Sequence, residues 1–287
     1  MGERSAEGDV VLTGGLSTPV VLRRGDAVHR TAGPWTPTVH RLLDHLHRAG
    51  VTFVPRALGM DEAGREVLSH LPGWVPTYPV PAPVWSRRVL VTAARQLAQV
   101  HAATRSFPAA EEAAGRTSTW QEAGRLPAEV VCLNDVGPYN MVFSGGPDGE
   151  DDDVDVTGWI DLDTAAPGPR AWDLAHLAYR LVPLTSADYT GSGPVDLERY
   201  RRRLLLLCDT YAEAGDGTSV PPEEVLSSFV DVLQHSAATA DRRFADGATE
   251  LDGHGDFYRR EVQWLLESAS ALLGWGTDTT AAPVEHP

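Results

Sequence analysis

Short apolar runs separated by turn residues dominate the first quarter of the chain. Arg24-Gly25-Asp26 is typical of a hairpin turn between two such runs. Over 36–49 the apolar residues recur at helical spacing, with Thr36 expected as N-cap and Pro37 in the first turn. Strands are predicted at 10–12, 19–22, 27–30, 53–58 and 66–71.

The remainder of the chain has a mainly helical pattern. The segment 74–83 is rich in proline and glycine and is expected to be a hinge. Two strand-like runs, 141–143 and 154–160, interrupt the helical pattern as a hairpin. Helices are predicted at 86–103, 171–181, 197–214, 222–243 and 256–273.

This order of elements predicts an α+β fold with two lobes. A small β-rich N-lobe is expected over 1–73, a hinge over 74–83 and a larger, mainly helical C-lobe over 84–275. The tail 276–287 is expected to be disordered. A ligand cleft is expected where the two lobes meet.

Charge narrows the possible partners. The formal net charge is −16 and the pI about 4.9, which argues against nucleic acid or an anionic membrane as partner. This acidity favours a cationic substrate, although solubility explains it equally well. All 24 basic residues are arginine, so a phosphate contact usually made by lysine falls to arginine.

Neither the cysteines nor the ends of the chain suggest an extracellular protein. Cys132 and Cys208 have no metal-site spacing and cannot form a disulfide scaffold. The polar, acidic start of the chain does not resemble a signal peptide, and no apolar run reaches the length of a membrane span. We therefore expect a cytoplasmic protein.

The candidate chemistry lies around the predicted hairpin. Asp135 and Asn140 stand five residues apart in a turn-rich loop before it, and Asp161 and Asp163 follow its second strand. One carboxylate that orients a hydroxyl, with an amide and a carboxylate that hold Mg²⁺, suits phosphoryl transfer. A turn pair that only caps backbone groups is the alternative for Asp135 and Asn140.

Three motifs in this region resemble the aminoglycoside phosphotransferase and choline kinase-like family, which has a protein kinase-like fold. Leu133-Asn134-Asp135 with Asn140 is similar to the family's His-Gly-Asp, four residues, Asn. Ile160-Asp161-Leu162-Asp163 resembles its metal-binding Ile-Asp-Phe/Trp-Asp, and 168–175 resembles its Gly-x-Pro-x-x-Asp-Leu-Ala helix start. Leu133 departs from the family histidine.

The resemblance implies roles for individual residues. Asp135 would orient the acceptor hydroxyl or accept its proton, and Asn140, Asp161 and Asp163 would coordinate Mg²⁺. For Asp163 a purely structural role is equally open. Asp173 is expected to brace the catalytic loop from a helix N-terminus.

The resemblance also implies a nucleotide site in the N-lobe. Arg30 stands where the family has its phosphate-contacting lysine, and no partner glutamate is evident in the following helix. The backbone around Gly14, Gly15 and Ser17 would cover the phosphates, and the segment that contains His70 would pair with the base. An ordinary strand-end arginine and a plain hairpin turn are the alternatives.

The leading hypothesis is a Mg²⁺-dependent phosphotransferase that moves the γ-phosphate of ATP or GTP to the hydroxyl of a small molecule. Antibiotic resistance and natural-product tailoring both fit. One alternative is a catalytically weak kinase-like binding module, since the family's lysine, glutamate and histidine are all missing from their places. Another is a kinase-fold enzyme with a different reaction.

Overall fold

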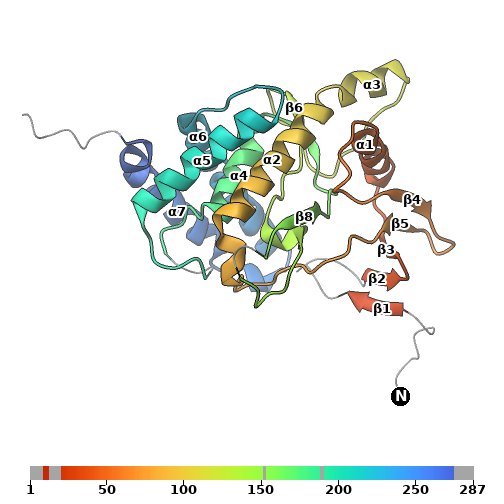
Figure 1. The fold of residues 1–287 in the computed structure, drawn as a ribbon. Helices are drawn as coiled ribbons and strands as arrows, with labels where there is room; N and C mark the ends of the chain where they lie inside the picture. The colour runs from red at the N-terminus through yellow and green to blue at the C-terminus, as the bar shows by residue number, and fades with distance from the viewer. Residues whose placement is uncertain (1–8, 13–20, 151–152, 188–190, 275–287) are drawn as a thin grey trace, which may run out of the picture.

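A five-stranded antiparallel sheet forms the N-terminal part of the computed structural model, which describes residues 9–12, 21–150, 153–187 and 191–274. The strand order is β1-β2-β3-β5-β4 (Figure 1). The sheet confirms the predicted β-rich start, with strands shifted by a few residues. The strands are β1 (Asp9–Leu12), β2 (Val21–Arg24), β3 (Ala27–Thr31), β4 (Ala57–Met60) and β5 (Arg65–Ser69).

One helix, α1 (Thr36–Arg48), packs beside this sheet and buries its apolar face. The predicted N-cap is wrong by one residue, because Trp35 occupies the cap and Thr36 lies inside the helix. The Thr36 hydroxyl instead accepts a hydrogen bond from the Gly33 amide at 2.9 Å and holds the entry turn. The buried apolar residues are those expected from the spacing: Val39, Leu42, Leu43 and Leu46.

Helices form most of the C-terminal part, on the opposite side of the molecule from the sheet (Figure 1). Ser86 and Asp196 cap two of them through their side chains, which fixes where those helices begin. A short helix over 107–113 was not expected, since its sequence is irregular. The helices are α2 (Arg87–Thr104), α3 (Phe107–Ala113), α4 (Arg170–Leu181), α5 (Leu197–Ala214), α6 (Pro222–Ala245) and α7 (His254–Leu273), with single 3₁₀ turns η1 (Ala82–Trp85), η2 (Pro138–Asn140) and η3 (Thr249–Leu251).

Two short strand pairs lie between the sheet and the helices and carry the loops of interest. The predicted hairpin is present: β7 (Met141–Phe143) pairs with β8 (Val156–Trp159). The pair β6 (Val130–Cys132) and β9 (Ala166–Gly168) places the start of the candidate loop next to the start of α4. A backbone bridge between Trp74 and Phe143 ties the segment after the sheet to this hairpin.

The fold is thus mixed α+β, with the sheet first and the helices after it, as predicted. Among the described residues, no helix combines the length and the apolar character that crossing a membrane requires. The tail 276–287 lies outside the residues that the structure describes.

Candidate active site

The loop between β6 and β7 brings Asp135 and Asn140 into direct contact. The Asn140 amide nitrogen donates to Asp135 Oδ2 at 3.0 Å and to the Asp135 carbonyl at 2.9 Å. The Tyr139 hydroxyl donates to Asp135 Oδ1 at 2.5 Å. The two residues that the motif predicted together therefore form one unit, and Tyr139 is a neighbour that the motif did not reveal.

The β7–β8 hairpin returns the chain to this loop just before Asp161. The Ile160 amide donates to the Asn140 carbonyl at 2.9 Å, so Asp161 follows directly on a residue bonded to the loop. Asn134 and Asp161 have φ of 67° and 60°, and no other described non-glycine residue has positive φ. Such backbone is uncommon and concentrates at functional sites. Asn134 directly precedes the predicted Asp135, and Asp161 is itself a predicted site residue.

Arg30, near the end of β3, reaches across to the residues that follow β8. Its Nη1 lies 2.8 Å from Asp161 Oδ1, and its Nη2 pairs with Asp163 Oδ1. Its Nε lies 2.5 Å from Glu66 Oε1. The structure thus assembles the predicted Arg30, Asp161 and Asp163 in one cluster that joins the sheet to the hairpin.

Glu66 is the acidic partner of Arg30 that could not be found on the helix. It stands on β5 opposite Arg30 in the antiparallel register, and its side chain is fully buried. Its second oxygen lies 3.0 Å from Nε2 of His40, which is in α1, the helix that the resemblance implies for the partner. The signal in the sequence would have been the strand register that pairs Arg30 with Glu66.

One guanidinium among three carboxylates leaves this cluster with excess negative charge. Burial alone would lower the pKa of Arg30, but Asp163, Glu66 and Asp161 together raise it above its ordinary value. Burial raises the pKa of Asp163 to about 6; Arg30 opposes this shift, and Asp161 and Glu66 add to it. The cluster therefore favours an additional cation.

The donor chemistry of these residues fits Mg²⁺. Mg²⁺ prefers hard oxygen ligands and is usually held by one or two carboxylates together with substrate phosphates. The Asp161 side chain is 42% exposed, and its pairing with Arg30 uses only Oδ1. Asn140 uses its amide nitrogen toward Asp135, which leaves its carbonyl oxygen for a ligand. Asp161 and Asn140 thus offer suitable oxygen donors for Mg²⁺. Asp163, which pairs with the same arginine as Asp161, can add a third.

A buried aspartate holds the loop from behind. Asp173, in the first turn of α4, accepts hydrogen bonds from the backbone amides of Leu133 at 2.6 Å and Asn134 at 2.9 Å. This confirms the predicted brace. Leu133 is buried, and its carbonyl accepts from the Thr164 hydroxyl at 2.8 Å. The loop is therefore positioned through its main chain, so leucine in place of histidine leaves its hydrogen bonds intact.

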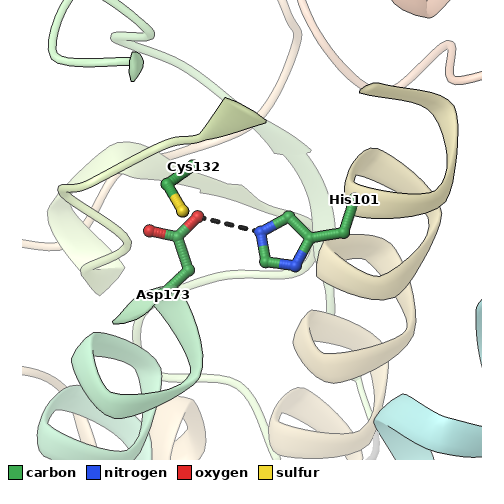
Figure 2. Close-up of side chains that lie close together, drawn as sticks. All are labelled: His101, Cys132 and Asp173. Carbon is green, nitrogen blue, oxygen red and sulfur yellow. Dashed lines mark hydrogen bonds and ion pairs between the residues drawn. The ribbon is translucent and has the colours of Figure 1, made fainter. Parts of the chain in front are cut away.

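The brace has a second layer that sequence reasoning missed. His101, on α2, points its Nε2 at Asp173 Oδ2 at 3.0 Å, and both side chains are fully buried (Figure 2). Its Nδ1 lies 2.7 Å from the Tyr211 hydroxyl, which accepts from Arg170 at 3.0 Å. His101 continues the apolar spacing of Leu97 on α2, so a histidine on a buried helix face was the available signal.

Cys132 stands beside this pair, and the three side chains lie close enough to hold a metal (Figure 2). However, Asp173 already accepts three hydrogen bonds, and the Cys132 thiol donates to the Pro169 carbonyl. Burial raises the pKa of Cys132 well above its ordinary value, so the thiolate that a metal needs is disfavoured. The arrangement is that of a structural brace.

The predicted phosphate-covering residues Gly14, Gly15 and Ser17 lie outside the described residues. His70 directly follows β5, where the chain leaves the sheet. Its backbone amide donates to the Asp26 carbonyl at 2.8 Å, so a nucleotide base would have to use other groups of this segment. Burial lowers the pKa of His70, and the positive charge of Arg23 lowers it further.

The face of α4 that follows Asp173 carries His176, whose titration gives a testable pH dependence. Burial lowers the pKa of His176 from 6.5 to about 3; Asp173 opposes this shift, and Arg180 and Arg125 add to it. Because the folded-state pKa is depressed, neutral His176 contributes stability that is complete above about pH 6.5. This contribution is lost as the pH falls toward about 3.

We therefore expect His176→Gln to reduce the acid sensitivity of folding. The free energy of unfolding of the variant, relative to wild type, should rise by about 2 kcal/mol between pH 7 and pH 4.5. Urea unfolding at a series of pH values measures this difference. If the difference in the free energy of unfolding between variant and wild type does not change with pH, His176 takes up its proton without destabilising the folded protein.

Comparison with known proteins agrees with this geometry. A model of the "Phosphotransferase enzyme family" matches residues 75–214. The trifolitoxin immunity protein of Rhizobium leguminosarum bv. trifolii is 33% identical over 278 residues, which cover 92% of this chain and 95% of that protein.

Solved structures share the fold. A choline/ethanolamine kinase family protein from Mesorhizobium loti has a TM-score of 0.58 at 15% identity, covering 94% of this chain and 92% of that one. Plasmodium vivax ethanolamine kinase has a TM-score of 0.61 at 8% identity, covering 91% and 84%. The chain therefore belongs to the phosphotransferase enzyme family and has its protein kinase-like fold.

Proposed function

We propose that this protein transfers the γ-phosphate of ATP or GTP to a hydroxyl group of a small molecule. The observation that carries the proposal is a hydrogen-bonded connection between two groups of residues. The Asp135–Asn140 pair is hydrogen-bonded through the hairpin to the segment in which Asp161 and Asp163 meet Arg30. A hydroxyl-orienting carboxylate next to a phosphate-binding and metal-binding cluster is what phosphoryl transfer requires.

In the proposed mechanism, Asp135 accepts a hydrogen bond from the acceptor hydroxyl and takes its proton as the bond to phosphorus forms. The bond between the γ-phosphorus and the β-phosphate oxygen breaks, and the nucleoside diphosphate leaves. Arg30 contacts the phosphates with the guanidinium that now pairs with Asp161 and Asp163. Mg²⁺, held by Asn140, Asp161 and Asp163, would neutralise charge on the phosphates.

The biological setting that we propose is protection against a toxic compound. The relative from Rhizobium leguminosarum is named as an immunity protein and aligns over nearly its whole length. Phosphorylation of a hydroxyl adds charge and bulk to a compound, which would prevent its binding to a target. Tailoring of a natural product by the same reaction is compatible with the site.

The test is nucleotide consumption with Mg²⁺ across a panel of hydroxylated acceptors, with phosphorylated product identified by mass spectrometry. ATP and GTP are compared as donors, and thermal shift measures Mg²⁺-nucleotide binding in parallel. We expect product from at least one acceptor and a rise in Tm with nucleotide. The proposal fails if no acceptor is phosphorylated and no nucleotide binds.

A kinase-like module that binds nucleotide without turnover is the second candidate. One observation favours it: all three nitrogens of Arg30 pair with carboxylates, so a phosphate must compete with them. Nucleotide binding in the thermal-shift assay, without product from any acceptor, would identify this alternative.

A further inference from the structure

The guanidinium of Arg180, near the end of α4, lies among tyrosine rings. Its Cζ is 4.6 Å from the centre of the Tyr179 ring and 5.5 Å from that of Tyr139. Tyr78, in the segment after the sheet, and Tyr258, on α7, are also close enough to interact electrostatically with it. The faces of two of these rings, Tyr139 and Tyr179, thus stabilise the cation, and two further tyrosines lie near it.

Unlike Arg30 and Arg170, the partly buried Arg180 has no carboxylate partner among the described residues. Its Nε is buried without a hydrogen-bond partner, and no ion pair involves its side chain within the described ranges. By contrast, Arg30 pairs with three carboxylates and Arg170 pairs with Asp216. A buried donor without a partner is costly, and the guanidinium has no opposite charge beside it in the described part of the chain, which indicates that an external anionic group completes it.

This cation stands next to the proposed position of the acceptor hydroxyl. One of the two rings that it contacts belongs to Tyr139, whose hydroxyl donates to Asp135 at 2.5 Å. A molecule that presents its hydroxyl to Asp135 therefore lies within reach of Arg180.

A second arginine, Arg125, lies along the same face of α4 as Arg180, with Glu122 nearby. Trp172, His176 and Arg180 recur at helical spacing along one face of α4. Arg125 stacks on Trp172, with its Cζ 3.8 Å from the ring centre, and His235 lies edge-on to the same ring. Three carboxylates of the C-terminal helices have other partners: Glu261 accepts from the Ser186 amide, and Asp241 and Asp256 pair with Arg259.

We propose that the acceptor carries a carboxylate, which Arg180 binds through its guanidinium while the tyrosine rings contact the adjoining part of the molecule. This inference rests on the proposed function and names the substrate class for the same site. It replaces the cationic acceptor suggested by the overall charge, because charges within contact distance decide what a buried subsite binds. Planar guanidinium and carboxylate groups match in a two-point hydrogen bond.

The test compares matched hydroxylated compounds that differ in one group, of which phenyllactate, phenyllactamide and 1-amino-3-phenylpropan-2-ol are one set. Several such sets of aromatic and aliphatic compounds are screened for binding by ligand-observed NMR without nucleotide. We expect the carboxylates to bind about tenfold or more tightly than their amide and amine counterparts. Binding without nucleotide keeps the result independent of turnover, so failure of phosphoryl transfer does not affect it.

Variants then assign the preference to one residue. Arg180→Gln should abolish the preference for carboxylates, and Arg180→Lys should keep part of it, since lysine retains the charge without the fork. Arg202→Gln, an exposed arginine on α5, is the matched control and should behave as wild type. The inference is overturned if amides or amines bind as well as carboxylates to wild type, or if no compound binds. It is also overturned if folded Arg180→Gln, checked by circular dichroism, keeps the preference.

Discussion

Asp135→Asn is expected to lower kcat by about 10²–10⁴-fold, since it removes the carboxylate that takes the acceptor proton. The substitution keeps the size of the side chain. Nucleotide affinity should stay close to that of wild type, because Asp135 contacts Tyr139 and Asn140 and is not among the carboxylates paired with Arg30. Steady-state kinetics with the best acceptor and nucleotide binding by calorimetry measure the two effects separately.

The matched control is Asp153→Asn, an exposed aspartate in the loop of the β7–β8 hairpin. Its kcat should remain at the wild-type value. If Asp135→Asn retained kcat within about threefold of wild type, Asp135 would not be the proton acceptor. A loss of nucleotide binding in the same variant would instead show that the two halves of the site are coupled.

Asp173→Ala should lower the free energy of unfolding by about 3–5 kcal/mol. The substitution leaves two buried backbone amides, of Leu133 and Asn134, without acceptors and removes the partner of His101. An unsatisfied buried donor costs about 1–3 kcal/mol, and here several arise together. Urea unfolding monitored by circular dichroism gives the change.

Asp209→Ala, an exposed aspartate on α5, provides the comparison and should change stability by less than about 0.5 kcal/mol. Asp173→Asn should fall between the two, because an amide oxygen can still accept from one backbone amide. If Asp173→Ala unfolded at the same urea concentration as wild type, the buried hydrogen bonds would not hold the loop.

The sequence predicted the helices well where side chains fix their ends. α5 occupies the expected residues 197–214 because Asp196 caps its first turn, and Ser86 does the same for α2. The short helix α3 was missed because its seven residues give too little periodicity to distinguish it from a loop. Local signals thus define long elements and leave short ones open.

Some site residues could not be predicted from the sequence because their roles depend on contacts between distant segments. The loop pair Asp135 and Asn140 and the brace Asp173 were evident from spacing within motifs. Glu66 and His101 were not, because each depends on how separate elements pack: Glu66 on the register of β3 and β5, and His101 on the approach of α2 to α4. Motif spacing describes a loop, whereas its partners follow from tertiary structure.

The brace also has a consequence for recognising related chains. Asp173 binds the loop through amide hydrogens, which nearly every amino acid provides, so these bonds do not require histidine at position 133, where an apolar side chain packs in the core. A consensus search centred on the histidine would pass over such chains as degenerate copies. An aspartate in the first turn of α4, together with the loop's Asp and Asn, is a more general sequence pattern to search for. Such a search would also find divergent family members that keep the same loop hydrogen bonds.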